Sequence, residues 1–362
     1  MTQAVALAQQ ASTGVSQGFK NRIINGAMVI SQYNGTSSVT PTDSSFALDR
    51  FKCRLSQTSK YTVQQNAGSV TPPVGFSNYL GVTSSSAYSI VASDFFELEQ
   101  SIEGFNTADL GWGTANAKTI TLSFQVYSSL TGTFGGAIQN SARNRSYPFT
   151  YSIPVANTWT TISVTIAGDT SGTWIGATNG IGLTIAFSLG TGSTYSTTAG
   201  AWASGIYWSA TGATSVVGTS GATFYITGVQ LEVGSTATNF DTRSIGTELQ
   251  LCQRYFWRMN GRSSGGNATF AAGQVYNSTD VRAVLTNPVP MRADTSITFT
   301  GTNFAYSNAG SVKTLGTPLA ADQTTQTALL YSGAGTTSAT QGQAAFWVIT
   351  NTDTFISVSA EL

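Results

Sequence analysis

The chain of 362 residues is long enough for two domains with separate hydrophobic cores. Only 9% of its residues are charged and the formal net charge is +0, which excludes a broad basic surface for nucleic acid or for acidic membranes. Hydrophobic residues make up 41% of the chain and exclude a disordered protein. The sequence has no histidine, so the commonest general base and the commonest metal ligand are both missing.

The chain begins with a segment rich in Ala, Gln and Ser, and we expect an N-terminal anchor segment, residues 1–20, that orders only against a partner. No positive charge precedes its short apolar run, so we predict that it is not a signal peptide. No stretch of the chain approaches the length of a transmembrane helix, so we predict no membrane insertion and folding in a reducing cytoplasm. The candidate anchor residues are Val5, Leu7, Phe19 and Lys20.

Two segments alternate apolar residues with charges, the period-two pattern of a half-buried strand. The cationic row is Arg50, Lys52 and Arg54. The acidic row is Glu97, Glu99 and Glu103. We interpret the rows as solvated faces or as partners on neighbouring strands, where opposite charges contribute roughly 0.2–1 kcal/mol per pair. Two alternatives stay open. The cationic row could bind phosphate or an anionic glycan, and the acidic row could form a glycosidase carboxylate pair or a Ca²⁺ site.

Most of the first 243 residues predict strands. A first strand over residues 21–31 is broken by a turn signal, Asn25-Gly26. Residues 120–210 read as strands at regular spacing without helical patterns between them, which excludes parallel βαβ units. We therefore predict an all-β fold, with two packed antiparallel sheets that form a jelly-roll β-sandwich over residues 21–243.

The last strand of this predicted sandwich spans residues 222–233. Its apolar and polar residues alternate, and Gly228 is a predicted bulge where the alternation slips by one residue. The residues predicted to lie on or near its buried face are Phe224, Ile226, Val229, Leu231 and Val233.

The pattern changes after the sandwich. Apolar residues recur at helical spacing over residues 247–257, which predicts a helix within a linking segment, residues 244–258. Residues 259–362 alternate again and predict a small C-terminal β domain. Cys53 and Cys252 lie far apart in the sequence, and we expect two buried free thiols rather than a disulfide.

Aromatic residues gather in loops rich in Gly, Ser and Thr. Sugar rings stack on exposed aromatic faces, and neighbouring polar side chains bind their hydroxyl groups. The alternative for these rings is a packing role at the ends of the sandwich or in a subunit interface, and the alternative for two nearby arginines is packing on Tyr147. The candidate carbohydrate-binding residues are Trp174, Trp202, Tyr207, Trp208, Arg143 and Arg145.

Two motifs of the chain carry a resemblance to a known family. The first is NRIINGAM with a following LDRF, and the longer one is ATFYITGVQLEVGSTATNFDTRSIGTELQLCQRYF. Both resemble a module found in structural proteins of tailed bacteriophages, such as tail fibres and virion fibres, and the likeness covers nearly the whole chain from about Asn21 on. The resemblance implies a jelly roll similar to galactose-binding and carbohydrate-binding modules, a location in the virion and often a trimer. It carries over no catalytic residues.

We therefore expect a non-enzymatic structural component of a tailed-phage virion, a tail fibre or spike subunit that recognises host-surface carbohydrate. Its expected partners are further copies of the chain in a homotrimer, other virion proteins of the tail, neck or capsid, and a host glycan, with assembly in the host cytoplasm. Two alternatives stay open: a capsid, head-fibre or neck decoration protein without receptor binding, and a polysaccharide depolymerase. We expect no cofactor, and a structural Ca²⁺ in a loop is the one metal that stays open.

Overall fold

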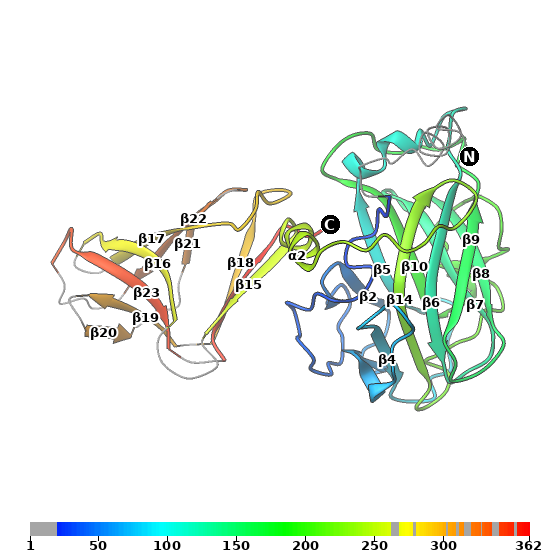
Figure 1. Cartoon of the computed structure of the whole chain (residues 1–362), viewed down its shortest axis with the longest axis horizontal. Coiled ribbons are helices and arrows are strands. Elements are labelled where there is room, and N and C mark those ends of the chain that lie inside the picture. Colours follow the sequence, from blue (N-terminus) through cyan, green and yellow to red (C-terminus); the bar gives the residue numbers. More distant parts are fainter. Residues whose placement is uncertain are drawn as a thin grey trace, which may run out of the picture. The chain divides into compact units, whose positions relative to one another are not determined.

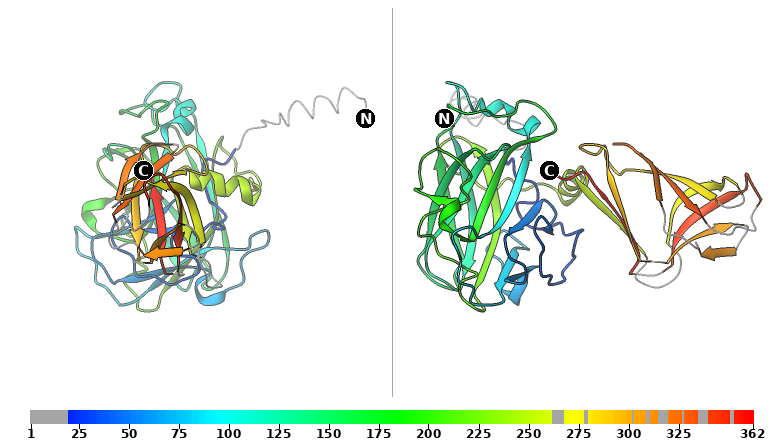
Figure 2. Two further views of the ribbon diagram at one scale, coloured as in Figure 1. Left: turned by 90° about the vertical axis from the view of Figure 1, so that its left-hand side faces the viewer. Right: turned by 180° about the vertical axis from the view of Figure 1, so that it is seen from behind.

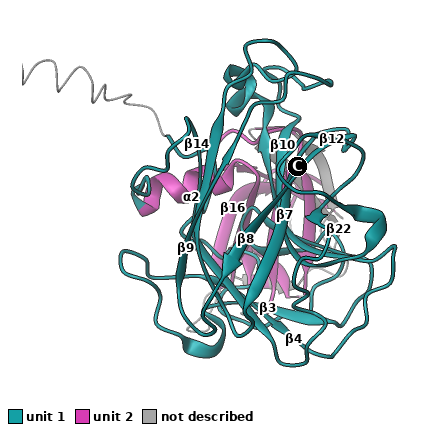
Figure 3. Ribbon diagram, turned by 90° about the vertical axis from the view of Figure 1, so that its right-hand side faces the viewer, with its two compact units in different colours: residues 1–244 teal, residues 245–362 magenta. Residues whose placement is uncertain are grey.

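The computed structural model describes residues 20–261, 268–277, 280–301, 303–308, 311–314, 320–326, 328–334, 340–350 and 353–362 (Figure 1). The predicted anchor residues Val5, Leu7 and Phe19 lie outside the described residues. The chain divides into two compact units, residues 1–244 and residues 245–362 (Figure 3). Each unit has its own hydrophobic core and is described by itself.

Unit 1 is a jelly-roll β-sandwich whose two antiparallel sheets lie face to face (Figure 2). The order across the seven-stranded sheet is β1 (Phe46–Leu48), β2 (Phe51–Leu55), β5 (Phe95–Glu103), β10 (Ile181–Thr191), β7 (Gly132–Asn140), β8 (Arg145–Ile153) and β12 (Ala203–Ser204). The order across the five-stranded sheet is β3 (Tyr61–Gln65), β4 (Leu80–Ser84), β14 (Thr223–Val233), β6 (Ile120–Ser128) and β9 (Thr160–Ile166). These sheets confirm the all-β sandwich that the alternating segments predict.

Short elements connect the strands of unit 1. A parallel pair of two-residue strands, β11 (Ser196–Thr197) and β13 (Ser209–Ala210), forms a small sheet of its own, and β13 packs against β7 and β8. The single-turn 3-10 helices are η1 (Ala67–Ser69), η2 (Gly104–Asn106), η3 (Ala108–Leu110) and η4 (Ser193–Tyr195).

The core of unit 1 lies between the two sheets because each strand turns its apolar residues toward the opposite sheet. On β6, Leu122, Phe124 and Val126 are buried, whereas Ser123 and Gln125 alternate with them and face outward. Burial of apolar area at about 25 cal/mol per Å² holds the sheets together. The outer face of the five-stranded sheet is therefore free to be polar.

Strand β14 carries the bulge that the sequence predicts. Its pairing with β6 shifts register between Thr227 and Gln230, and Gly228 between them has a φ of +62°, a left-handed conformation that favours glycine. The predicted buried residues up to Leu231 are all fully buried, whereas Val233, the last residue of the strand, is 42% exposed.

Residues 21–31 form no strand, in contrast to the prediction. Two backbone hydrogen bonds join the segment to β14, from Arg22 N to Leu231 O and from Val229 N to Gly26 O, and side-chain hydrogen bonds take the place of a regular ladder between them. The side chain of Asn21 donates from Nδ2 to Val229 O at 3.0 Å, and its Oδ1 accepts the N–H groups of Ile23 and Leu231 at 2.9 and 3.0 Å. The asparagine is 3% exposed, so these bonds fix the segment against β14. The two motifs that carry the phage resemblance thus contact each other.

The cationic and acidic rows face each other on neighbouring strands of the seven-stranded sheet. In the antiparallel pairing of β2 with β5, Lys52 lies opposite Glu99 and Arg54 lies opposite Glu97. This register confirms the cross-strand interpretation for these residues. Arg50, the third cation of its row, donates to a backbone carbonyl group of β5 at 2.6 Å instead.

Unit 2 contains a helix, α2 (Ile245–Gln253), and two sheets. The order across the three-stranded sheet is β15 (Phe256–Asn260), β24 (Phe355–Ser359) and β18 (Ser296–Thr300). The order across the seven-stranded sheet of this unit is β20 (Ser311–Thr314), β19 (Phe304–Asn308), β23 (Ala344–Ile349), β16 (Ala268–Val275), β17 (Asp280–Thr286), β22 (Ala328–Ala334) and β21 (Ala320–Thr324). Among the described residues, no helix is long and apolar enough to span a membrane.

Helix α2 is shorter than predicted. The spacing of apolar residues predicts a helix over residues 247–257, but the helix ends at Gln253 and strand β15 begins at Phe256. Trp257 then lies opposite Val358 of the C-terminal strand β24 and is 4% exposed. Pairing with a distant strand and burial of two aromatic rings outweigh the local helical pattern here.

Candidate functional site

The six predicted carbohydrate-binding residues fall into two clusters in unit 1. The first cluster, beside the outer face of the seven-stranded sheet, contains Arg143, Tyr207 and Trp208. The second, around Asp169, contains Arg145, Trp174 and Trp202. The predicted anchor residue Lys20 lies in neither cluster and donates from Nζ to Thr238 Oγ1 at 2.7 Å.

In the first cluster the Trp208 ring is packed against other rings. It is 5% exposed, stacks on Tyr195 with ring centroids 5.1 Å apart, and meets Phe95 edge-on at 4.0 Å. The chain that carries it lies against the sheet, where Gln139 Nε2 donates to Tyr207 O at 2.9 Å. Little of the Trp208 ring is therefore left for a sugar to stack on.

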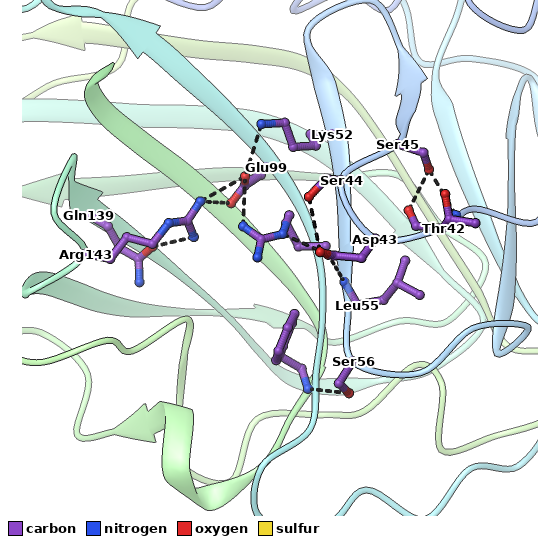
Figure 4. Close-up of polar contacts among 12 residues, drawn as sticks. Thr42, Asp43, Ser44, Ser45, Lys52, Leu55, Ser56, Glu99, Gln139 and Arg143 are labelled. Atoms are coloured by element: carbon purple, nitrogen blue, oxygen red, sulfur yellow. Dashed lines mark hydrogen bonds and ion pairs between the residues drawn. The ribbon is translucent and has the colours of Figure 1, made fainter. Parts of the chain in front are cut away.

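Next to Trp208, the carboxylate of Glu99 gathers cations (Figure 4). Arg143 donates from Nη2 to both carboxylate oxygens at 3.1 and 2.9 Å. Arg54 Nη1 and Lys52 Nζ lie 3.7 and 4.0 Å from Oε1 of the same carboxylate. Because the Glu99 side chain is only 2% exposed, these cations are committed to an internal ion cluster.

Glu97 lies beside this ion cluster and is 1% exposed. Thr191 Oγ1 donates to its Oε1 at 3.1 Å, while Oε2 has no hydrogen-bond partner among the described residues. Burial raises the pKa of Glu97 well above its ordinary value of 4.5, and the charge of Glu99 acts in the same direction. An acid with a raised pKa next to a second carboxyl group resembles the pair that glycosidases use, but both groups are 1% exposed and out of a substrate's reach.

The second cluster is an assembly of indole rings. Trp112, Trp174 and Trp202 meet edge-on with ring centroids 4.7, 5.2 and 5.5 Å apart. Each indole N–H has an acceptor: Lys118 O for Trp112, Asp169 Oδ2 for Trp174 and Ala167 O for Trp202, at 2.8, 3.2 and 2.7 Å. Trp174 and Trp202 stay partly exposed and pack against the core of unit 1.

In this second cluster, Arg145 holds the carboxylate of Asp169 in place. Its guanidinium donates from Nη2 and Nε to the two oxygens of that carboxylate at 2.6 and 2.8 Å. Burial alone raises the pKa of Asp169, but the hydrogen bonds from Arg145, Ser171 and Trp174 outweigh it and hold the pKa below its ordinary value of 3.8. The arginine therefore holds an internal partner, as a packing residue does.

A groove with a volume of about 440 Å³ opens elsewhere, on the outer face of the five-stranded sheet. Its floor is formed by outward-facing side chains of β6 and β9, in the directly opposed pairs Ser123–Ser163 and Gln125–Thr161. Two loops form its walls, residues 74–76 and residues 237–242. Their rings, Phe76 and Phe240, meet edge-on with centroids 5.0 Å apart.

The bulge in β14 positions one of these walls. A Cβ atom at Gly228 would lie 2.6 Å from Cζ of Phe76, so a glycine at this position lets the ring approach the strand this closely. The same residue has the left-handed backbone that the bulge requires. The glycine predicted from the slip in alternation thus shapes the groove.

Several polar groups in the groove are free to bind a ligand. Thr161 Oγ1 donates to Gln125 Oε1 at 3.1 Å, which leaves the amide N–H groups of Gln125 without a partner in the described part of the chain. The side chains of Ser123, Ser163 and Asn239 likewise make no hydrogen bond to a described residue. Hydroxyl and amide groups that both donate and accept are the groups that bind sugar hydroxyls.

A second aromatic group continues the same face beyond the groove. Tyr127 follows Ser123 and Gln125 on β6 and stacks on Tyr225 of β14, with centroids 5.3 Å apart and planes at 6°. Trp159 lies 5.5 Å from Tyr127 and donates from Nε1 to Thr71 O at 2.9 Å. This bond fixes the start of the loop that carries Phe76 to the side chain of Trp159.

The described residues include no cluster of acidic side chains of the kind that binds a metal ion. Within the described ranges, no group of three or more Asp, Glu or Cys side chains could hold a metal ion. The structural Ca²⁺ considered from the sequence therefore has no candidate set of ligands there and stays a prediction.

Comparisons with known proteins find likeness in the fold. No protein-family model and no curated protein matches the chain. Among solved structures, a tailspike protein 4 domain of bacteriophage CBA120 is 13% identical with a TM-score of 0.34, and the match covers 59% of this chain and 22% of that one. The chain thus spans about a fifth of the tailspike domain.

Two bacterial proteins match over their full length. A family 11 carbohydrate-binding module from Clostridium thermocellum is 12% identical, with a TM-score of 0.28 and 57% of this chain covered. A putative sugar-binding protein from Bacteroides thetaiotaomicron is 11% identical, with a TM-score of 0.30 and 59% covered. At these identities and scores, nothing that these proteins bind transfers to this chain.

The sequence analysis missed the groove because its parts are distant in the sequence. Phe76 and Phe240 are 164 positions apart (240 minus 76) and meet only because β14 pairs with β4 and β6. A weak signal was present in β6, whose polar face of Ser123 and Gln125 carries no charge.

Proposed function

We propose that this protein is a structural component of a tailed-phage virion, a tail fibre or spike subunit that binds a host-surface glycan through the groove. The observation that carries the binding part is the uncharged polar floor of Ser123, Gln125, Thr161 and Ser163 beneath two phenylalanine rings. The virion part rests on the resemblance of the two motifs and on their contact in the fold.

The geometry of the groove suits a sugar. A volume of about 440 Å³ lies within the range of roughly 300–1,000 Å³ that ligand sites occupy. The C–H face of a sugar ring packs on aromatic carbon, while its rim of hydroxyl groups needs partners that donate and accept. The groove offers both kinds of partner side by side, and the free side-chain groups on its floor have no competing internal bond.

The predicted tryptophan sites are weaker candidates. Trp208 is covered, and Arg143 and Arg145 are engaged with Glu99 and Asp169. Trp174 and Trp202 are partly exposed, so a second contact with a glycan there stays part of the proposal. A non-enzymatic role fits the burial of Glu97 and Glu99, and a homotrimer with further virion partners completes the proposal.

The test is binding of the full chain to a glycan array, followed by competition with phage for adsorption to host cells. Phe76→Ala and Phe240→Ala should each weaken binding by about two- to tenfold, since a ring contact contributes roughly 0.5–1.5 kcal/mol. Phe105→Ala is the matched control, because Phe105 is 58% exposed and does not line the groove. Folded groove variants that bind and block as well as the unaltered chain would overturn the groove as the site.

A result without any binding would point to another role. If the folded chain binds no glycan and does not block adsorption, the decoration protein becomes the better proposal. Release of reducing ends from a bound polysaccharide would instead favour the depolymerase.

A further inference from the structure

We infer that the groove selects an uncharged polysaccharide, bound as an extended chain along β6 from the phenylalanine pair toward Tyr127. This inference rests on the proposed function and adds the class of glycan. It depends on three features of unit 1. The residues that line the groove carry no charge, arginines of the unit are paired with carboxylates elsewhere, and a second aromatic group lies on the same face.

The groove itself holds no charge. None of the described residues that line it is Asp, Glu, Lys or Arg. A carboxylate, sulfate or phosphate on a sugar would lose water on entering and would find no cation to pair with. Neutral hydroxyl groups meet no such cost, because Ser123, Ser163 and Gln125 replace their bonds to water.

Charged groups of both signs lie next to the wall of the groove. Lys20 Nζ donates to Thr238 Oγ1 at 2.7 Å, and this hydroxyl donates to Glu232 Oε2 at 2.7 Å. A cation and a carboxylate thus share one hydroxyl group of the groove wall. A second carboxylate, Asp241, stands between the lining residues Phe240 and Thr242 and accepts the backbone N–H group of Lys20 at 2.9 Å, so these groups give a ligand no excess of positive charge.

Three arginines of unit 1 are paired with carboxylates away from the groove. Arg54 and Arg143 bind Glu99 on the outer face of the other sheet, so the core of the sandwich separates them from the groove. Arg145 is held by Asp169. These three arginines therefore add no basic surface that would attract a negatively charged glycan to this site.

The length of the ligand follows from the direction of β6. Ser123, Gln125 and Tyr127 lie on one face of the strand, and alternate residues are about 7 Å apart, so the row extends over about 13 Å. Tyr127 and Trp159 form a second aromatic surface at the far end of this row. A single sugar ring would contact one aromatic group, whereas an extended chain would contact both.

The experiment measures binding of the full chain to two panels of polysaccharides. The neutral panel contains dextran, mannan, galactan and β-glucan, and the acidic panel contains hyaluronan, polysialic acid and polygalacturonate. We expect binding to a neutral polymer, with an affinity that changes less than about twofold between about 50 and about 500 mM salt. For oligosaccharides of the bound polymer, affinity should rise with chain length, and Tyr127→Ala should remove this rise while Tyr127→Phe keeps it.

The outcomes separate the inference from the proposed function. If an acidic polymer binds, weakens about tenfold or more with salt, and is lost in Phe76→Ala, the groove binds glycan but the inference is wrong. If affinity does not depend on chain length, the extended mode along β6 is wrong. If neither panel binds while the chain is folded, the proposed glycan site fails as a whole.

Discussion

Glu97 and Glu99 are two residues apart on one face of β5, and their surroundings are opposite. Glu99 meets Arg143, Arg54 and Lys52, whereas Glu97 has one hydroxyl donor and an oxygen without a partner among the described residues. Burial favours the neutral form of a carboxyl group, and close cations favour the charged form. The same residue type therefore has two different roles in one strand.

This difference predicts that the same substitution, Glu to Gln, has a large effect on the free energy of unfolding at Glu99 and a small one at Glu97. Glu99→Gln should lower the free energy of unfolding by about 3 kcal/mol at neutral pH, the lower end of the cost of breaking a buried pair, because the cations around it are partly exposed and Arg54 keeps Asp43 as a partner at 2.9 Å. Glu97→Gln should change it by less than about 1 kcal/mol, because burial already favours the neutral form of this carboxyl group, which an amide imitates. Urea unfolding of both variants measures the two costs, and equal costs would contradict the assignment.

The pH dependence of stability gives the same prediction a second readout. The folded-state pKa of Glu97 is raised, so its contribution to stability is fully present below about pH 4.5 and is lost as pH rises toward the folded pKa. Asp169 behaves in the opposite way: its pKa is lowered, so its contribution is present above about pH 3.8 and is lost as pH falls through the folded pKa. Glu97→Gln should flatten only the decline at higher pH, and Asp169→Asn only the decline at lower pH.

At the scale of elements, the bulge in β14 links backbone conformation to the groove. Gly228→Ala should lower stability by about 1–2 kcal/mol through strain at a φ of +62°. It should also weaken glycan binding, because the new Cβ would displace the Phe76 ring. Gly221→Ala is the matched control, since Gly221 has a φ of +72° and open space around the added atom.

The two variants separate strain from position. Both should lose stability in thermal unfolding, but only Gly228→Ala should lose affinity in the glycan assay. A similar loss of affinity in both variants would mean that the bulge acts through stability alone and does not position Phe76.

The elements also show which features the sequence could predict. Alternation is local, so it predicted the strands 50–55, 95–103 and 222–233, and the slip at Gly228 predicted the bulge. The order of strands is not local. Phe256 enters β15 rather than the helix because Ser359, more than a hundred residues later, pairs with it. The groove could not be predicted for the same reason, since its walls meet only through the strand order.

At the scale of the whole molecule, every residue that lines the groove belongs to unit 1, between Val74 and Thr242. The buried residues of the two units form separate core clusters. Residues 1–244 should therefore fold without unit 2 and keep the complete site. Calorimetry of this fragment should show one cooperative transition, and the full chain should show a second one that belongs to unit 2.

The fragment also tests whether binding to a cell surface depends on assembly. Residues 1–244 should bind a soluble oligosaccharide with the affinity of the full chain, because one site suffices for a ligand that presents one epitope. On immobilised polysaccharide, a trimeric full chain should bind about a hundredfold tighter than a monomeric fragment, because its linked sites engage together. Light scattering after size-exclusion chromatography gives the number of copies for both proteins. If the folded fragment does not bind the soluble ligand, then unit 2 or a neighbouring copy completes the site. If the fragment and a trimeric full chain bind the immobilised polymer equally well, then the sites of the trimer cannot reach one surface together.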